Sequence, residues 1–168
     1  MRQRAARSPA WCAEVLTAAL ISSCIAADHL RVSANADGAA EITTSAGLTR
    51  AIAKEPGQVG IRSPQVAADG ATAGWLVDFA DPDSASPYAG TLVIWRAGRV
   101  IRRFQSEQAF YSWAFYGGKQ VAFHSGPLHG EAAARCELHD IASGRRLAHW
   151  DGDLHSADKP VWTAHLDH

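Results

Sequence analysis

The chain has 168 residues and is nearly neutral, because 16 Lys and Arg stand against 17 Asp and Glu, a net charge of −1. Apolar residues make up 47% of the sequence, which excludes a disordered chain, and three cysteines are too few for a disulfide scaffold. The lack of a basic surplus argues against nucleic acid as a partner. We therefore expect one soluble globular domain.

The N-terminal segment 1–27 has the layout of a secretory signal. It begins with three arginines, Arg2, Arg4 and Arg7. An apolar stretch at 15–21 follows, and small residues precede Asp28. The apolar stretch is too short to span a bilayer, which takes about 20 residues. The sequence thus predicts export, to the periplasm or as a secreted protein; a cytoplasmic N-terminal helix, favoured by Glu14, is the alternative.

Two kinds of cleavage fit this signal. Cleavage after Ala26 puts small residues at the expected positions. The stretch Ile-Ser-Ser-Cys at 21–24 instead resembles the lipobox of bacterial lipoproteins, which implies a lipid on Cys24 and anchoring to the cell envelope. Both leave a single domain at 28–168, whose one cysteine, Cys136, can form no internal disulfide.

The sequence after residue 28 predicts an all-β fold, because short β-rich runs alternate with glycine-containing turns and no helical period persists. In chain order, the expected strands are 30–34, 41–45, 48–53, 65–68, 73–79, 91–95, 99–104, 111–115, 120–124, 136–141, 145–150 and 161–166. Asp69-Gly70 and Ala97-Gly98 are typical turn dipeptides between such strands.

A 46-residue repeat organises these strands. Residues 63–104 fall into register with residues 109–150 without a gap, so that Gly98 matches Gly144 and Phe104 matches Trp150. We expect two four-stranded antiparallel meanders, preceded by a partial N-terminal hairpin and followed by a C-terminal strand. Phe104 and Trp150 should occupy equivalent places, both buried between neighbouring sheets.

Turn motifs within the repeat carry a family resemblance. The Asp69-Gly70 turn and the stretch 138–145, Leu-His-Asp-Ile-Ala-Ser-Gly-Arg, are similar to turns in WD40 or TolB-like β-propeller blades. The resemblance implies a propeller-like arrangement of blades. Propellers have four to eight blades, so two blades imply an open stack, a closed sandwich or barrel, or a ring completed by another copy of the chain.

One loop carries a candidate metal site. His124, His129 and Glu131 lie close together in sequence, and imidazole with carboxylate can hold a divalent metal. A further ligand has to come from elsewhere, and no HExxH spacing is present. A hydrogen-bonded loop is the simpler interpretation, so we expect no cofactor.

Two other clusters have a structural interpretation as well as a functional one. Asp78, Asp81 and Asp83 supply oxygen atoms that suit Ca²⁺, but the EF-hand spacing is absent and a solvated loop is the favoured interpretation. Aromatic residues alternate on the expected strand 111–115 and can receive sugars or peptides, but core packing between sheets is the more common role. They are Tyr111, Trp113 and Phe115.

The sequence offers no catalytic constellation. It has no G-x-S-x-G motif and no glycine-rich phosphate loop, and Cys136 sits in an expected strand beside Glu137, a setting that does not activate a thiol. Three hypotheses follow. The chain is an exported, non-catalytic binding or interaction protein of the cell envelope, a metal-dependent enzyme using the His124 loop, or a structural subunit that completes a β ring by self-association.

Overall fold

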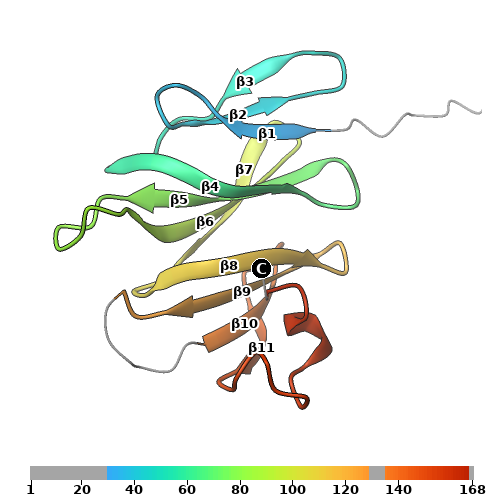
Figure 1. Cartoon of the computed structure of the whole chain (residues 1–168). Coiled ribbons are helices and arrows are strands. Elements are labelled where there is room, and N and C mark those ends of the chain that lie inside the picture. The colour runs from blue at the N-terminus through green and yellow to red at the C-terminus, as the bar shows by residue number, and fades with distance from the viewer. Residues whose placement is uncertain (1–29, 129–134, 167–168) are drawn as a thin grey trace, which may run out of the picture.

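The computed structural model describes residues 30–128 and 135–166. Within them, eleven strands form three antiparallel sheets that lie one above another (Figure 1). The predicted all-β fold is confirmed. This part of the chain contains no helix of the length and apolarity needed to cross a membrane.

Each sheet is a meander of consecutive hairpins, because strands that follow one another in sequence are also neighbours in space. Sheet A contains β1 (Arg31–Ala34), β2 (Ala40–Thr43) and β3 (Thr49–Ala51). Sheet B contains β4 (Gln58–Val66), β5 (Thr72–Phe79), β6 (Tyr88–Arg96) and β7 (Arg99–Gln105). Sheet C contains β8 (Ala109–Tyr116), β9 (Gln120–Gly126), β10 (Arg135–Asp140) and β11 (Arg146–Trp150).

The predicted turn dipeptides close hairpins for identifiable reasons. Between β4 and β5, Asp69 Oδ1 accepts hydrogen bonds from the backbone N–H groups of Ala71 and Thr72, at 2.9 and 2.8 Å. Between β6 and β7, Ala97 and Gly98 both have positive φ, 49° and 83°, as a two-residue type I′ turn requires.

Two of the sheets have four strands in meander order, as expected, but their last hairpins pair in different registers. In sheet B, Leu92 pairs with Phe104. In sheet C, Leu138 pairs with Ala148, and not with Trp150. The cause is loop length, since two residues lie between β6 and β7 whereas five lie between β10 and β11. A shift of two residues keeps every side chain on its face, but the expected equivalence of Phe104 and Trp150 is wrong. Phe104 is buried between sheets B and C, whereas Trp150 is only partly buried and packs in the cluster under the C-terminal segment.

The first strand of sheet B is longer than the sequence indicates. It runs from Gln58, not from Gln65, and its pairing with β5 shifts between Arg62 and Gln65. Pro64 lies in this irregular stretch and cannot donate to a ladder. It is tolerated because β4 is an edge strand that pairs only with β5.

The C-terminal segment is not the expected strand. Val161–Thr163 forms a short 3₁₀ helix, η1, in place of a strand over 161–166. Thr163 stabilises this turn, because its backbone N–H and its hydroxyl both donate to the carbonyl of Pro160, at 2.9 and 2.7 Å. Within the described residues the three sheets form an open stack and do not close into a ring (Figure 1).

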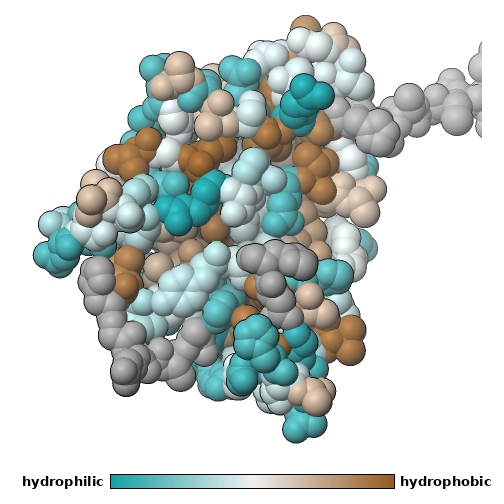
Figure 2. Space-filling view, in the orientation of Figure 1, coloured by the Kyte–Doolittle hydropathy of each residue, from teal (hydrophilic) through white to brown (hydrophobic). Residues whose placement is uncertain are grey.

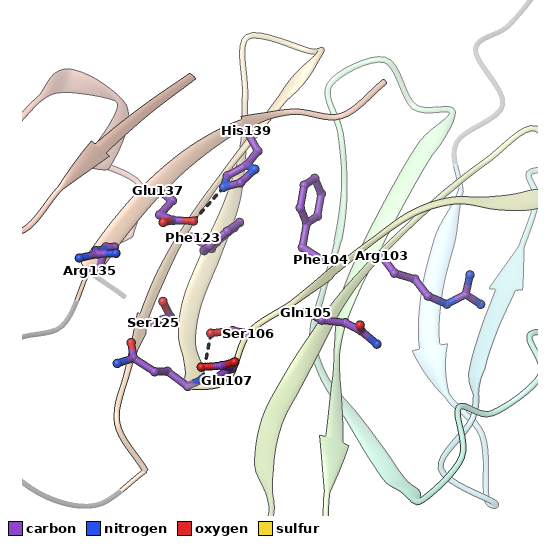
Figure 3. A pocket seen from close by; sticks show the side chains of 11 residues that line it. Arg103, Phe104, Gln105, Ser106, Glu107, Phe123, Ser125, Arg135, Glu137 and His139 are labelled. Carbon is purple, nitrogen blue, oxygen red and sulfur yellow. Dashed lines mark hydrogen bonds and ion pairs between the residues drawn. The ribbon is translucent and has the colours of Figure 1, made fainter. Parts of the chain in front are cut away.

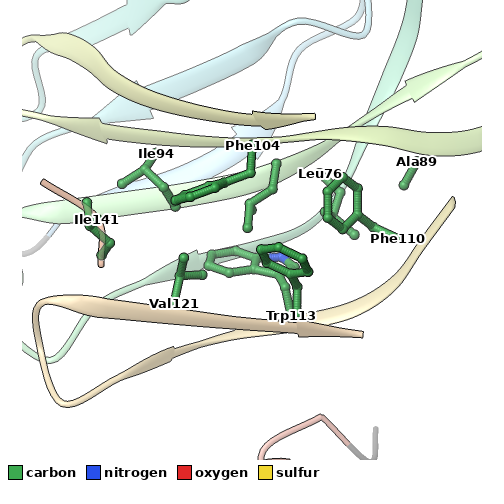
Figure 4. Close-up of a cluster of buried hydrophobic side chains, with 10 residues drawn as sticks. Leu76, Ala89, Ile94, Phe104, Phe110, Trp113, Val121 and Ile141 are labelled. Carbon is green, nitrogen blue, oxygen red and sulfur yellow. The ribbon is translucent and has the colours of Figure 1, made fainter. Parts of the chain in front are cut away.

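The main core lies between sheets B and C (Figure 4). Leu76, Leu92 and Ile94 from sheet B meet Phe110 and other aromatic side chains from sheet C. These four side chains are almost fully buried, at 0 to 2% exposure. The two sheets are therefore held together by apolar packing over their facing surfaces.

A β-bulge decides which aromatic residues of β8 enter this core. The pairing of β8 with β9 shifts between Phe110 and Ser112, which leaves Tyr111 as the extra residue. Phe110 and Trp113 are consequently buried together, whereas Tyr111 is 48% exposed. The expected single face of Tyr111, Trp113 and Phe115 is thus wrong for Tyr111 and right for the other two, which pack against the core.

Sheet A covers the other face of sheet B. Ile42 of β2 packs against Trp75, Val93 and Trp95 of sheet B in a second apolar cluster. Apolar side chains also reach the surface along the seam between these two sheets (Figure 2). The N-terminal residues 30–53 therefore form a small sheet that covers one face of sheet B.

An arginine links each sheet to a hairpin of the next one. Arg50 Nη1 of β3 donates to the carbonyl of Gly98, at 2.7 Å. Arg102 of β7 donates from Nε to the carbonyl of Ile141, at 3.1 Å, and from Nη2 to that of Ala142. We call the contacts of Arg50 and those of Arg102 the two arginine clasps. In both, an arginine on the last strand of one sheet hydrogen-bonds to the last hairpin of the next sheet.

We expect Arg102→Ala to lower the free energy of unfolding by about 1 kcal/mol, because two carbonyl groups lose a charged donor and regain water only in part. Urea unfolding followed by circular dichroism measures the effect. Arg99→Ala is the matched control, since Arg99 is an exposed arginine on the same strand. Equal stability of the two variants would show that the clasp contributes nothing.

Candidate functional site

A cleft of about 540 Å³ opens between sheets B and C beside edge strand β7 (Figure 3). The wall on the side of sheet B is formed by β7 and the turn to β8, with Arg103, Phe104, Gln105, Ser106, Glu107 and Gln108. The wall on the side of sheet C is formed by β9 and β10, with Phe123, Ser125, Arg135, Glu137 and His139. Small-molecule sites typically have volumes of about 300–1,000 Å³, so this cleft has a suitable size.

Strand alternation places the polar groups of the sheet C wall on one face. Phe123 pairs directly with Glu137 across β9 and β10, and Ser125 pairs with Arg135. Side chains of directly paired residues lie side by side on the same face of a sheet. His139 is two residues from Glu137 and therefore points the same way.

Three rings form the base of the cleft. The His139 ring stacks on Phe123 with a centroid distance of 4.9 Å and meets the edge of Phe104 at 5.2 Å. Phe104 comes from sheet B and the other two rings come from sheet C. The base therefore continues the inter-sheet core into the cleft.

Glu137 is the most tightly held polar group of the cleft. Its Oε2 accepts a hydrogen bond from His139 Nε2 at 2.9 Å, and its Oε1 accepts one from Arg146 Nη1 at 2.8 Å. Burial opposes ionisation of this carboxyl, but these hydrogen bonds and the neighbouring positive charges outweigh it. The pKa of Glu137 therefore lies below its ordinary value, and the cleft holds a fixed carboxylate.

His139 is oriented from both sides of its ring. Its Nδ1 lies 3.1 Å from the carbonyl oxygen of Gly144, and its Nε2 faces the Glu137 carboxylate. The two contacts hold the ring from opposite sides. The ring is thereby locked in place rather than free to rotate.

Both arginines of the cleft have a carboxylate partner in the protein. Arg103 Nε lies 2.6 Å from Glu55 Oε1, and Arg135 Nε lies 2.7 Å from Asp151 Oδ1. Glu137 is likewise matched by Arg146. The charges of Arg103, Arg135 and Glu137 are thus compensated, whereas Glu107, which also lines the cleft, makes no ion pair with another described residue.

His124, the described one of the three metal ligands suggested by the sequence, does not line this cleft. His124 lies on β9, next to Phe123 and on the opposite face of the strand, and its ring meets that of Tyr111 at a centroid distance of 5.2 Å. His129 and Glu131 lie outside the described residues, as does Cys24. Among the described residues, no group of three or more His, Cys, Asp or Glu is placed to hold a metal.

The acidic cluster of the sequence has other partners. Asp78 lies inside β5 and accepts a hydrogen bond from Arg62 Nε at 2.5 Å. Asp81 Oδ1 accepts the backbone N–H of Asp83 at 2.9 Å, which shapes the loop between β5 and β6. These contacts give the three aspartates local structural roles.

Sequence reasoning missed Glu137 and His139 as a pair. The alternation of Cys136 and Leu138 with these two polar residues is the signal that could have found them, because it assigns both to one face of β10. Cys136 and Leu138 pack on the other face against the C-terminal segment. No protein-family model and no curated protein sequence matches the chain.

Proposed function

We propose that this chain is an exported, non-catalytic binding protein of the cell envelope, and that the cleft between sheets B and C is its ligand site. The observation that supports it best is the fixed Glu137 carboxylate, held by His139 and Arg146 inside a cleft of about 540 Å³. A group that is already oriented loses little entropy when it binds a ligand. Export rests on the arginine-rich and apolar pattern of residues 1–27.

The chemistry of the walls favours a neutral ligand with many hydroxyl groups, such as a saccharide of one or two rings. The charges of Arg103, Arg135 and Glu137 are compensated within the protein, so a charged ligand gains little from them. Gln105 and Gln108 add amide donors and acceptors. The base formed by His139, Phe104 and Phe123 adds a small ring surface that a sugar ring can contact.

Isothermal titration calorimetry with three neutral disaccharides, maltose, cellobiose and chitobiose, tests this proposal. We expect at least one to bind saturably, and Glu137→Gln to weaken that binding about tenfold, because it replaces a charge-assisted hydrogen bond by a neutral one. Glu41→Gln in sheet A is the matched control and should leave the affinity unchanged.

The two possible failures of this experiment are distinguishable. If none of the disaccharides binds saturably at millimolar concentration, the ligand class is wrong. If one binds and Glu137→Gln retains full affinity while its melting temperature is unchanged, the site is wrong.

A further inference from the structure

A second cavity, of about 500 Å³, lies at the other inter-sheet boundary, between sheet A and the hairpin that joins β6 to β7. Its lining differs from that of the cleft because most of it is apolar, with Leu30, Ile42 and Trp95 as contributors. Leu48 also lines it and is 71% exposed. An exposed leucine at the edge of an apolar cavity favours a site for an apolar molecule.

Strand pairing explains how sheet A builds its wall. Ile42 pairs directly with Arg50 across β2 and β3, and the backbone N–H of Thr44 donates to the carbonyl of Leu48 at 3.0 Å. These four side chains therefore lie on one face of sheet A. Ile42 is packed against sheet B, so this is the face that looks toward sheet B.

Two polar atoms of the lining residues are buried without a hydrogen-bond partner among the described residues. They are Nε1 of Trp95 and Oγ1 of Thr44. Trp95 as a whole is only 6% exposed. A buried polar group without a partner costs about 1–3 kcal/mol, and an indole N–H can be satisfied only by an acceptor.

Arg50 adds a positive charge to the same cavity. Its Nη1 donates to the carbonyl of Gly98, and within the described part of the chain it makes no ion pair with a carboxylate. Arg96 also lines the cavity, but Asp69 compensates its charge at 2.8 Å. The cavity thus combines an apolar lining with two buried hydrogen-bonding groups, those of Trp95 and Thr44, and with the charge of Arg50, which no carboxylate of the described residues compensates.

We propose that this cavity binds an alkyl carboxylate, a molecule with an apolar chain and one anionic end. The chain lies against Leu30, Ile42 and Leu48, and the carboxylate pairs with Arg50. A carboxylate offers about four acceptor sites, so it can also accept from the Thr44 hydroxyl, which lies diagonally across the strand pair from Arg50. This site is independent of the cleft between sheets B and C.

Calorimetry of the full chain with decanoate, below its micellar concentration, tests this site. We expect saturable binding of decanoate, weaker binding of decanol, and no binding of decyltrimethylammonium. Arg50→Gln should weaken the binding of decanoate about tenfold and leave the affinity for decanol unchanged, because only the carboxylate pairs with the charge of Arg50. The control variant Arg99→Gln alters an exposed arginine at the start of β7. It should bind decanoate with the affinity of the unaltered chain.

Leu48→Asp provides a second variant with little risk to folding, because Leu48 is largely exposed. This substitution puts a negative charge at the exposed edge of the cavity, where it repels the carboxylate, and it should weaken decanoate binding more than tenfold. The proposal is overturned if decanoate fails to bind saturably. It is also overturned if decyltrimethylammonium binds as well as decanoate, or if Arg50→Gln weakens decanol and decanoate equally.

Discussion

Trp113→Ala should lower the free energy of unfolding by about 4 kcal/mol, the range for an aromatic residue removed from a close-packed core. Trp113 is 2% exposed and lies in the apolar cluster between sheets B and C. Its Nε1 donates to the carbonyl of Ser63 on β4 at 2.9 Å, so the substitution also removes a hydrogen bond between the sheets. Small domains have a total stability of about 5–15 kcal/mol, so the loss is large.

The packing around Trp113 leaves little room for relaxation. A side chain at Gly74 would place its Cβ 2.6 Å from the Trp113 ring, so the tryptophan lies directly on the backbone of β5. Gln65 Nε2 also donates to the Trp113 carbonyl at 2.7 Å. A cavity left by Trp113→Ala is therefore bounded by backbone that does not collapse easily.

Urea unfolding, monitored by far-ultraviolet circular dichroism, measures this effect. Tyr111→Ala is the control, because Tyr111 is an aromatic residue of the same strand that the bulge leaves 48% exposed. We expect that variant to lose far less stability. A loss of less than 1 kcal/mol in Trp113→Ala would contradict the assignment of this residue to the inter-sheet core.

The sequence predicted the features that depend on local chemistry. Turn dipeptides such as Asp69-Gly70 and Ala97-Gly98 require positive φ or side-chain capping, and the chain turns at both places. Strand alternation between such turns likewise predicted most strands of the two four-stranded sheets. Turn chemistry and alternation act over a few residues, so they are visible without knowledge of the packing.

Features set by longer-range contacts could not be predicted in this way. The bulge at Tyr111 changes which residues of β8 face sheet B, and no turn residue marks it. The two-residue difference between the last hairpins comes from loop length, which a gapless repeat hides. Each feature is fixed by pairing with a neighbouring strand.

The candidate cleft was harder still to predict, because its two walls come from different sheets. Glu137 and Phe104 are 33 residues apart in sequence, and only the stacking of sheet C on sheet B brings both to one cavity. Arg146 and His139 then orient Glu137 from β11 and β10. A sequence motif contains neither the stacking nor the hydrogen bonds that follow from it.

The second large effect concerns the C-terminal segment, which covers the outer face of sheet C. Trp162 and Leu166 pack against Cys136 and other apolar residues of this face. The carbonyl of Leu166 also accepts a hydrogen bond from the hydroxyl of Ser112 on β8, at 2.7 Å. The segment therefore covers the end of the stack although it adds no strand to the sheet.

We expect Trp162→Ala to lower the free energy of unfolding by about 3 kcal/mol and to expose the apolar face around Cys136. Exposed apolar faces promote association, so the variant should also aggregate at lower protein concentration, which light scattering detects. Val161→Ala is the matched control, since Val161 is the neighbouring residue and is 79% exposed. If both variants melt at the temperature of the unaltered chain, the C-terminal segment contributes no cover, and sheet C is stable with its outer face open.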